Sequence, residues 1–322
     1  MKILIVRFSS IGDIILTTPV IRCVKNQVPN AEVHFVTKKA YLGLLDGNPY
    51  IDAKFGLEDR FSDLVNQLQE EKYDYIIDLH NNLRSKRLTF ALRVKSRRVN
   101  KLNFPKWLLV KWKKNTLPDK HIVDRYLEVA SDFEISNDGK GLDYFIPEST
   151  EINADFNLPK NYYCYAIGGQ HNTKKMPLEK IVALVESTSI PVVLIGGKED
   201  IQIGNAVATS TSNAINLCGK LSIAESALAM KRASWVITHD TGMMHIAAAL
   251  NLKVLSIWGN TVPSFGMTSY MAHQQSKVFE VTNLGCRPCS KIGFETCPKG
   301  HFKCMKNQDV SGMVQWLETA NN

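Results

Sequence analysis

The segment 235–250 joins an apolar run to a helix-forming run through a short polar turn. Residues 235–238 are β-branched or aromatic, which is typical of a buried strand, whereas the residues after Gly242 are rich in Ala, Met and Leu. Asp240 or Thr241 could cap the helix, and Gly242 would let a ligand approach the backbone closely. The free N–H groups and the dipole of a helix N-terminus attract anions. The segment is thus equally consistent with an anion site and with an ordinary capped turn.

Polar residues also follow other predicted strands. Asp13 lies in the turn SSIGD after the first strand, where a carboxylate could deprotonate a hydroxyl or simply cap a helix. Gly12 is the only glycine of that turn, so the dinucleotide fingerprint G-x-G-x-x-G is not met. Glu199 and Asp200 follow a Gly-Gly pair, where a carboxylate could bind ribose hydroxyls or cap the next helix.

The loop 168–177, GGQHNTKKMP, has the composition of a phosphate-binding loop. Its glycines follow a predicted strand, and Thr173 and Lys174 precede a helix whose first turn carries Pro177. The loop does not match G-x-x-x-x-G-K-[ST], which argues against a nucleoside triphosphatase. Lys174 or Lys175 could neutralise a diphosphate, although a solvated loop lysine is an equally good interpretation.

A Cys-rich segment lies near the C-terminus, at Cys286, Cys289, Cys297 and Cys304. In a cytosolic chain such thiols stay reduced, and four of them with one C-x2-C pair could hold a structural zinc ion. The alternative is that the thiols simply pack against their neighbours.

The net charge of +8 is concentrated in one part of the chain. Residues 79–118 contain twelve Lys or Arg and no Asp or Glu, and Trp107 and Trp112 lie among them. Basic residues interleaved with aromatic ones suit a membrane surface with anionic lipid, or nucleic acid. A solvated basic surface is the simpler alternative.

The order of apolar segments predicts an α/β protein. The chain has 322 residues, which suits two domains, and no apolar run reaches the ~18 residues of a membrane span. Arg7 and Asp13 interrupt the apolar N-terminus, which favours a first strand over a signal peptide. Strands alternate with helices, as in a parallel doubly wound sheet, and the pattern restarts after residues 150–160. The strands are expected at 2–6, 32–37, 73–79, 162–168, 191–197, 213–219, 235–238 and 253–259.

Taken together, these motifs resemble glycosyltransferase family 9, the lipopolysaccharide heptosyltransferases. The matching segments span nearly the whole chain: ILIVRFSSIGDIILTTPV at the start, DLHNNLRS at 78–85, TKKMP at 173–177, GKLSIAE at 219–225, HDTGMMHIAAAL at 239–250, and CRPC with CPKGHFKCM within 286–305. The resemblance implies a GT-B fold, in which two Rossmann-like doubly wound domains face each other across a cleft. We expect an acceptor-binding domain at 1–155, a nucleotide-sugar-binding domain at 156–305, and a final helix at 306–322 that packs back on the first domain.

The resemblance also implies roles for individual residues. Asp13 matches the catalytic base, and Lys174 the lysine that binds the donor diphosphate. The other residues implied to bind the donor are Thr173, Glu199 for ribose (or Asp200), Leu221 for adenine, and Asp240, Thr241, Gly242 and His245. The residues implied to bind the acceptor are Ser10, Gly12, Arg84 and Ser85. The chain departs from the family at Lys175-Met176, where an aromatic residue often precedes the proline, and at 95–118, which has no match.

The implied reaction is an inverting transfer of heptose from ADP-heptose to the inner core of a lipopolysaccharide acceptor. A displacement at the anomeric carbon needs a base for the acceptor hydroxyl and positive charge for the departing diphosphate. The sequence contains no D-x-D, so we expect cationic side chains and a helix dipole to replace a metal ion. The expected partners are a nucleotide-diphosphate sugar, an anionic lipid-linked saccharide and the cytoplasmic face of the inner membrane, where the protein would bind peripherally.

Two alternatives remain open from the sequence. The chain could use another donor sugar or another glycan acceptor, or it could be a non-catalytic protein that binds nucleotide sugars or anionic glycans. Binding of nucleic acid is not expected, because no nucleic-acid motif accompanies the basic segment.

Overall fold

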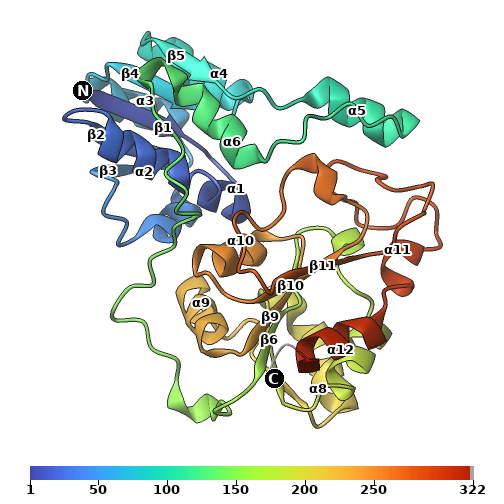
Figure 1. Ribbon diagram of the computed structural model, residues 1–322. Helices are drawn as coiled ribbons and strands as arrows, with labels where there is room; N and C mark the ends of the chain where they lie inside the picture. The colour runs from blue at the N-terminus through green and yellow to red at the C-terminus, as the bar shows by residue number, and fades with distance from the viewer. Residues whose placement is uncertain (320–322) are drawn as a thin grey trace. The chain divides into compact units, whose positions relative to one another are not determined.

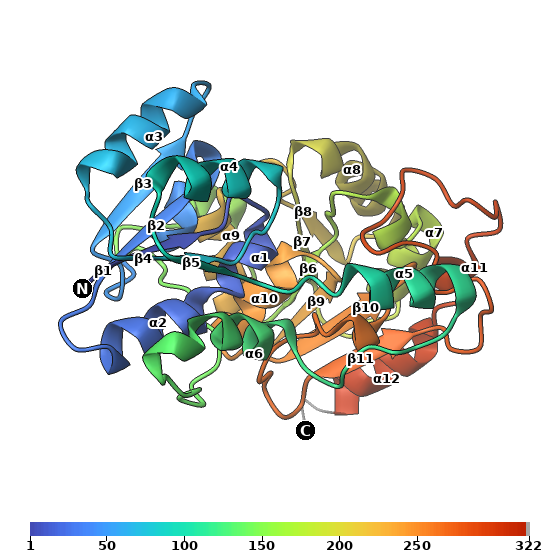
Figure 2. The same ribbon diagram turned by 90° about the horizontal axis from the view of Figure 1, so that it is seen from above.

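The chain forms two compact units. The computed structural model describes residues 1–319. One unit comprises residues 1–102 and 120–147, and the other comprises residues 103–119 together with the chain from 148 onwards. Across the described residues, no helix combines the length and apolar character that crossing a bilayer requires. Figures 1 and 2 show that the strands of each unit lie side by side with helices around them.

The first unit is built on a five-stranded parallel sheet with the order β3-β2-β1-β4-β5. Its central strand β1 (Lys2–Val6) is apolar and almost fully buried, as expected for a strand covered on both faces. The other strands are β2 (Glu32–Lys38), β3 (Ala53–Leu57), β4 (Tyr75–Asp78) and β5 (Ser96–Arg98). The helices are α1 (Ile11–Ile15), α2 (Thr18–Gln27), α3 (Phe61–Glu70), α4 (Leu83–Leu92) and α6 (Ile122–Leu127).

The second unit contains a six-stranded parallel sheet with the order β11-β10-β9-β6-β7-β8. Its strands are β6 (Tyr163–Ala166), β7 (Val192–Ile195), β8 (Ala214–Asn216), β9 (Trp235–His239), β10 (Val254–Trp258) and β11 (Lys277–Glu280). Its helices are α5 (Asn103–Trp112), α7 (Leu178–Glu186), α8 (Ile201–Ser210), α9 (Ile223–Arg232), α10 (Gly242–Ala249), α11 (Lys303–Lys306) and α12 (Val310–Thr319). The carboxyl ends of parallel strands lie at one edge of each sheet, and the predicted polar turns follow these ends.

The structure groups two segments differently from the predicted domain limits. Residues 103–119 belong to the second unit, because Leu109 is buried and Lys113 Nζ donates to the carbonyl oxygens of Cys286 and Pro288. The first unit ends at Pro147, ahead of the predicted limit at 155.

The last helix was predicted, as the segment 306–322, to pack on the first domain. In the described part, α12 packs on α7, and its apolar residues Met313 and Leu317 are buried in the core of the second unit. The packing of this segment on the first domain stays a prediction. Residues 320–322 of the predicted segment lie outside the described residues.

Candidate active site

Asp13 lies in the first turn of α1, and the short loop 7–10 joins this helix to the carboxyl end of β1. Its Oδ1 is 2.6 Å from Arg7 Nη2, and its Oδ2 accepts hydrogen bonds from Ser10 N at 3.2 Å and Ser10 Oγ at 2.9 Å. The carboxylate side chain is nevertheless 23% exposed. It is therefore held in one orientation while part of it stays open to a ligand. Gly12 is buried within the same short helix, next to this carboxylate.

Arg7, which the sequence did not identify as a site residue, fixes this arrangement. Its Nη1 donates to the carbonyl oxygen of Leu79 at 2.5 Å and to Tyr126 Oη at 2.9 Å, and its Nε donates to Ser9 O at 2.8 Å. Because these hydrogen bonds already fix the guanidinium group, Arg7 loses little further side-chain entropy when it pairs with the carboxylate. The signal in the sequence was a charged residue directly after a buried strand.

The surroundings of Asp13 favour its ionised form. Burial alone raises the pKa of the Asp13 carboxyl, but the charge of Arg7 and the hydrogen bonds from Ser10 lower it by more. The net pKa lies below the usual value, so the carboxylate is ready to accept a proton at neutral pH.

The motif DLHNNLRS forms the turn between β4 and α4. Asp78 Oδ1 accepts from the backbone N–H groups of His80 and Asn81, and Asp78 Oδ2 accepts from Ser85 Oγ at 2.7 Å. Ser85 is 0% exposed, so the structure gives it a supporting role in the turn, while its predicted contact with the acceptor stays a prediction. Arg84 is exposed and lies over the Phe8 ring at 5.8 Å, which leaves its guanidinium accessible.

His80 is a further residue of this turn that the sequence did not single out. It packs edge-on against Phe8, and burial, followed by the positive charge of Arg7, lowers its pKa to about 3. The imidazole is therefore neutral at physiological pH.

In the second unit, the structure brings together two residues that are 66 positions apart in the chain. Lys174 Nζ donates to Asp240 Oδ2 at 2.7 Å and to the Asp240 carbonyl oxygen at 3.0 Å. Thr261 Oγ1 also donates to Asp240 Oδ2 at 2.7 Å. The loop 168–177 and the turn after β9 thus meet, and the ammonium group lies next to the start of α10.

The N-terminus of α10 has the backbone geometry of an anion site. Thr241 is the N-cap residue, with φ −141° and ψ 177°, and its side chain makes no capping hydrogen bond. Gly169 approaches so closely that a Cβ placed on it would lie 3.2 Å from Thr241 Cγ2, which fixes the glycine loop beside this turn. Gly242 is the first residue of the helix, whereas His245 is buried further along it.

The two neighbouring carboxylates after β7 have different environments. Asp200 is buried, accepts a hydrogen bond from Gly197 N at 3.0 Å and lies 3.4 Å from Lys175 Nζ. Glu199 is exposed. Asp200 and Lys175 therefore support the loop, which leaves Glu199 as the carboxylate with room for a ribose. Leu221 is partly exposed, ahead of α9.

Two polar residues support the loop that carries Lys174. His239 Nε2 accepts a hydrogen bond from Met176 N at 3.0 Å and lies 3.0 Å from Tyr165 Oη. Burial lowers the pKa of His239 to about 4, so that the neutral ring keeps this acceptor. Thr173 is 2% exposed; its hydroxyl donates to Phe294 O at 2.9 Å and accepts from Phe294 N at 2.8 Å. The structure therefore gives Thr173 a positioning role, while the predicted donor contact of this residue stays a prediction.

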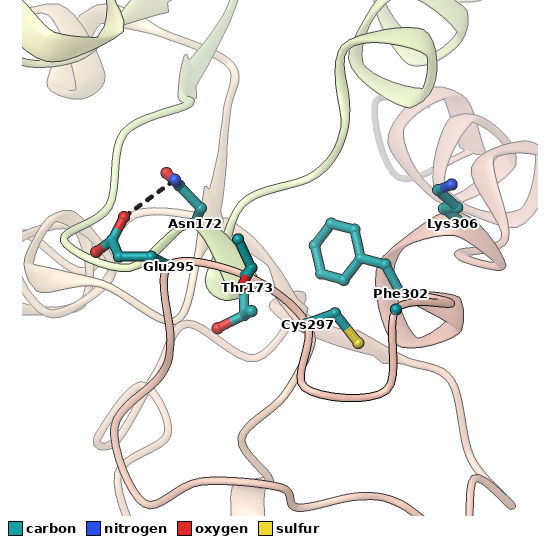
Figure 3. Close-up of a pocket in the computed structure, with 8 residues that line it drawn as sticks. Asn172, Thr173, Glu295, Cys297, Phe302 and Lys306 are labelled. Carbon is teal, nitrogen blue, oxygen red and sulfur yellow. Dashed lines mark hydrogen bonds between the residues drawn. The ribbon is translucent and has the colours of Figure 1, made fainter.

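A cavity of about 340 Å³ lies where the Cys-rich segment meets this loop. Figure 3 shows Asn172 and Glu295 on one side of Thr173, and Cys297 and Phe302 on the other. Asn172 Nδ2 donates to Glu295 Oε2 at 3.1 Å. Among the predicted donor-binding residues only Thr173 lines it, so this cavity is not the predicted diphosphate site.

The structure does not form the predicted zinc site. Within residues 1–319, the only group of three or more metal-binding side chains whose ligand atoms lie within 4.8 Å of one another is Glu32, His34 and Glu71. Both carboxylates of this group pair with the cation of Lys2. Cys304 is buried in the core of the second unit, whereas Cys286, Cys289 and Cys297 are only partly buried. The four thiols lie close enough for their charges to interact, because the other cysteines add to the effect of burial in raising the pKa of Cys289 and of Cys304. No three of their sulfur atoms lie within 4.8 Å of one another, so the structure does not support the predicted zinc ion.

Comparisons with known proteins agree on one family. The family model described as glycosyltransferase family 9 (heptosyltransferase) matches residues 61–298. The chain is 25% identical over 302 residues to lipopolysaccharide heptosyltransferase 1 of Campylobacter coli, a match that covers 82% of this chain and 85% of that protein.

Two solved structures are similar over almost the whole chain. A glycosyl transferase family 9 protein from Veillonella parvula has a TM-score of 0.79 at 20% identity, covering 99% of this chain and 96% of its own. The heptosyltransferase WaaC of E. coli, solved with ADP-2-deoxy-2-fluoro heptose, has a TM-score of 0.64 at 18% identity and covers 99% of this chain and 100% of its own. These likenesses confirm the predicted fold class, with two Rossmann-like units.

Proposed function

Because the chain belongs to glycosyltransferase family 9, we propose that this glycosyltransferase moves a heptose from ADP-heptose to the inner core of a lipopolysaccharide acceptor, with inversion and without a metal ion. The observation that carries the proposal is the cluster of Lys174, Asp240 and the uncapped N-terminus of α10. A cation beside free N–H groups at a helix N-terminus suits a diphosphate. The names of the relatives support heptose as the sugar and lipopolysaccharide as the acceptor.

In the proposed reaction, Asp13 removes the proton from an acceptor hydroxyl. The oxygen forms a bond to the anomeric carbon of the heptose as the bond to the diphosphate breaks, and ADP leaves with the bonding electrons. A single displacement of this kind inverts the configuration at that carbon. The ion pair with Arg7 keeps Asp13 ionised before the reaction, although the lowered pKa makes this carboxylate a weaker base than an ordinary aspartate.

The second unit stabilises the leaving group. Charge develops on the diphosphate as the bond breaks, and Lys174 together with the first N–H groups of α10 would oppose it. Glu199 would hold the ribose and Leu221 would contact the adenine. We place the reaction at the cytoplasmic face of the inner membrane, where a lipid-linked acceptor is available.

Mass spectrometry of the reaction products tests this function. The protein is incubated with ADP-heptose and a heptose-free lipopolysaccharide core, and parallel reactions contain UDP- or GDP-linked sugars. We expect ADP release and an acceptor that gains one heptose only with ADP-heptose. Transfer from another nucleotide sugar would identify a different donor, and binding of ADP-heptose without any product would identify a non-catalytic binding protein.

A further inference from the structure

Helix α5 contacts its own unit through one face only. Lys106, Leu109 and Lys113 recur at the spacing that places side chains on one side of a helix, with Lys113 just past its last turn. Lys106 lies over the Phe265 ring at 5.9 Å, Leu109 is buried, and Lys113 Nζ donates to the backbone of Cys286 and Pro288. Figure 2 shows the helix beside the loop that precedes α11. The opposite face of α5 is left to the solvent.

The exposed face of α5 is aromatic. Phe104, Trp107 and Lys111 follow one another at helical spacing, and Trp112 lies next to them. The exposed fractions are 67% for Phe104, 47% for Trp107 and 66% for Trp112, and the rings of Phe104 and Trp107 stack at 6.0 Å. Large apolar side chains gathered on one exposed face indicate an interaction surface.

The charge around this face is positive. Lys111 and Lys114 are exposed on or just after α5, and the segment 79–118 contains no Asp or Glu. Trp prefers the boundary between lipid headgroups and acyl chains, while Lys is attracted to anionic lipids. A helix of 10 residues with an aromatic face and lysines beside it fits a position in the plane of that boundary.

We propose that α5 docks the protein on an anionic lipid bilayer, with Phe104, Trp107 and Trp112 inserted among the headgroups and Lys111 paired with lipid phosphates. The inference rests on the proposed function in one respect, since a lipid-linked acceptor is met at a membrane. Nucleic acid is the less suitable partner. Proteins that bind single strands present their aromatic rings within a groove, whereas these rings project from the exposed face of one helix.

Co-sedimentation with lipid vesicles, in the absence of donor and acceptor, tests this docking surface. The full chain is mixed with vesicles of phosphatidylcholine alone, or of phosphatidylcholine with phosphatidylglycerol. We expect binding to the anionic vesicles only, weakened about tenfold or more by Trp107→Ala combined with Trp112→Ala. Lys111→Glu should weaken it by about fivefold. Met271→Ala removes an exposed apolar side chain elsewhere in the same unit and should bind like the parent.

Several results would overturn the inference. The parent protein could fail to bind anionic vesicles, or the double variant could bind as well as the parent. Binding of a single-stranded RNA oligonucleotide that depends on Trp107 and Trp112, without vesicle binding, would make α5 a nucleic-acid surface instead. Thermal unfolding of each variant checks that the fold is intact. Because the substituted side chains are exposed, we expect the unfolding temperatures to match that of the parent.

The vesicle experiment and the product assay can fail separately. Vesicle binding without ADP release would contradict the proposed reaction and leave the membrane contact in place. ADP release with a water-soluble core saccharide, but without vesicle binding, would contradict the membrane contact and leave the reaction in place.

Discussion

At the scale of single residues, the central feature is the ion pair between Arg7 and Asp13. It sets the protonation of the proposed base, because Arg7 and Ser10 lower the pKa of Asp13 by more than burial raises it. A carboxyl whose pKa is lowered in the folded protein is ionised down to acidic pH. Transfer should therefore fall only as the pH drops through this lowered pKa.

Arg7→Gln should move the acidic limb of the pH profile of kcat/KM upward, by about one to two pH units. The shift is upward because the substitution removes the Arg7 charge that favours the ionised form of Asp13, so Asp13 becomes protonated at a higher pH. The profile is measured against that of Arg60→Gln, an exposed arginine of the same unit. An unchanged acidic limb in a folded Arg7→Gln protein would mean that Asp13 is not the group that titrates.

The adjacent lysines 174 and 175 should respond differently to substitution. Lys174→Met is expected to weaken ADP binding by about 10- to 100-fold, since a charge-assisted contact with the diphosphate is lost. Lys175→Met should chiefly lower the unfolding temperature, because it leaves the buried Asp200 without its cation. Calorimetric titration with ADP and thermal unfolding separate the two effects, and equal ADP affinity in both variants would remove Lys174 from the donor site.

At the scale of elements, the Cys-rich segment supports the loop that carries Lys174. Thr173 and Phe294 are 121 positions apart, yet two side-chain hydrogen bonds and the bond from Thr173 N to Phe294 O connect them. The segment 285–305 therefore positions the loop 168–177 through the bonds between the Phe294 backbone and Thr173, and this role does not require a bound metal ion.

Thr173→Val should raise the KM for the donor and lower the unfolding temperature. It leaves the N–H and C=O of Phe294 without their side-chain partner, at a cost of about 1–3 kcal/mol. Thr173→Ser keeps the hydroxyl and is expected to restore both properties. Steady-state kinetics with thermal unfolding provide the measurement; a valine variant that matches the parent would show that the contact is dispensable.

Metal chelation should leave the second unit intact. Because no three sulfur atoms of the four cysteines lie within 4.8 Å of one another, the purified protein is expected to contain well below about one equivalent of zinc. Its unfolding temperature should also be the same with and without a chelator. A stoichiometric metal content, or a lower unfolding temperature after chelation, would contradict this description of the segment.

At the scale of the whole molecule, the sequence predicted the two parallel sheets and their central strands better than the strands at the edges. Apolar runs such as KILIV and the regular alternation with helices were sufficient for the two parallel sheets, because strands buried on both faces have a strong signal. Strands β3, β5 and β11 were missed because they lie at the edges of their sheets and are partly exposed, so they lack a continuous buried apolar run.

The proposed site was predictable where a residue lies in the polar loop that follows a strand. Asp13, Lys174 and Asp240 all lie in such loops, whereas the partners that orient them come from distant parts of the chain. The bonds of Arg7 to Leu79 and Tyr126, and that of Thr173 to Phe294, depend on tertiary packing and leave no local pattern. Burial of Ser85 likewise follows from its bond to Asp78, which a motif alone does not show.

The most direct test of the central claim is Asp13→Asn, measured as ADP release from ADP-heptose with a core acceptor. The amide keeps the shape of the carboxylate but cannot accept the proton, so we expect turnover to fall by about 10²- to 10⁴-fold. ADP binding should be unchanged, because the second unit holds the nucleotide. Near-normal turnover of Asp13→Asn, with ADP bound as in the parent, would contradict the account.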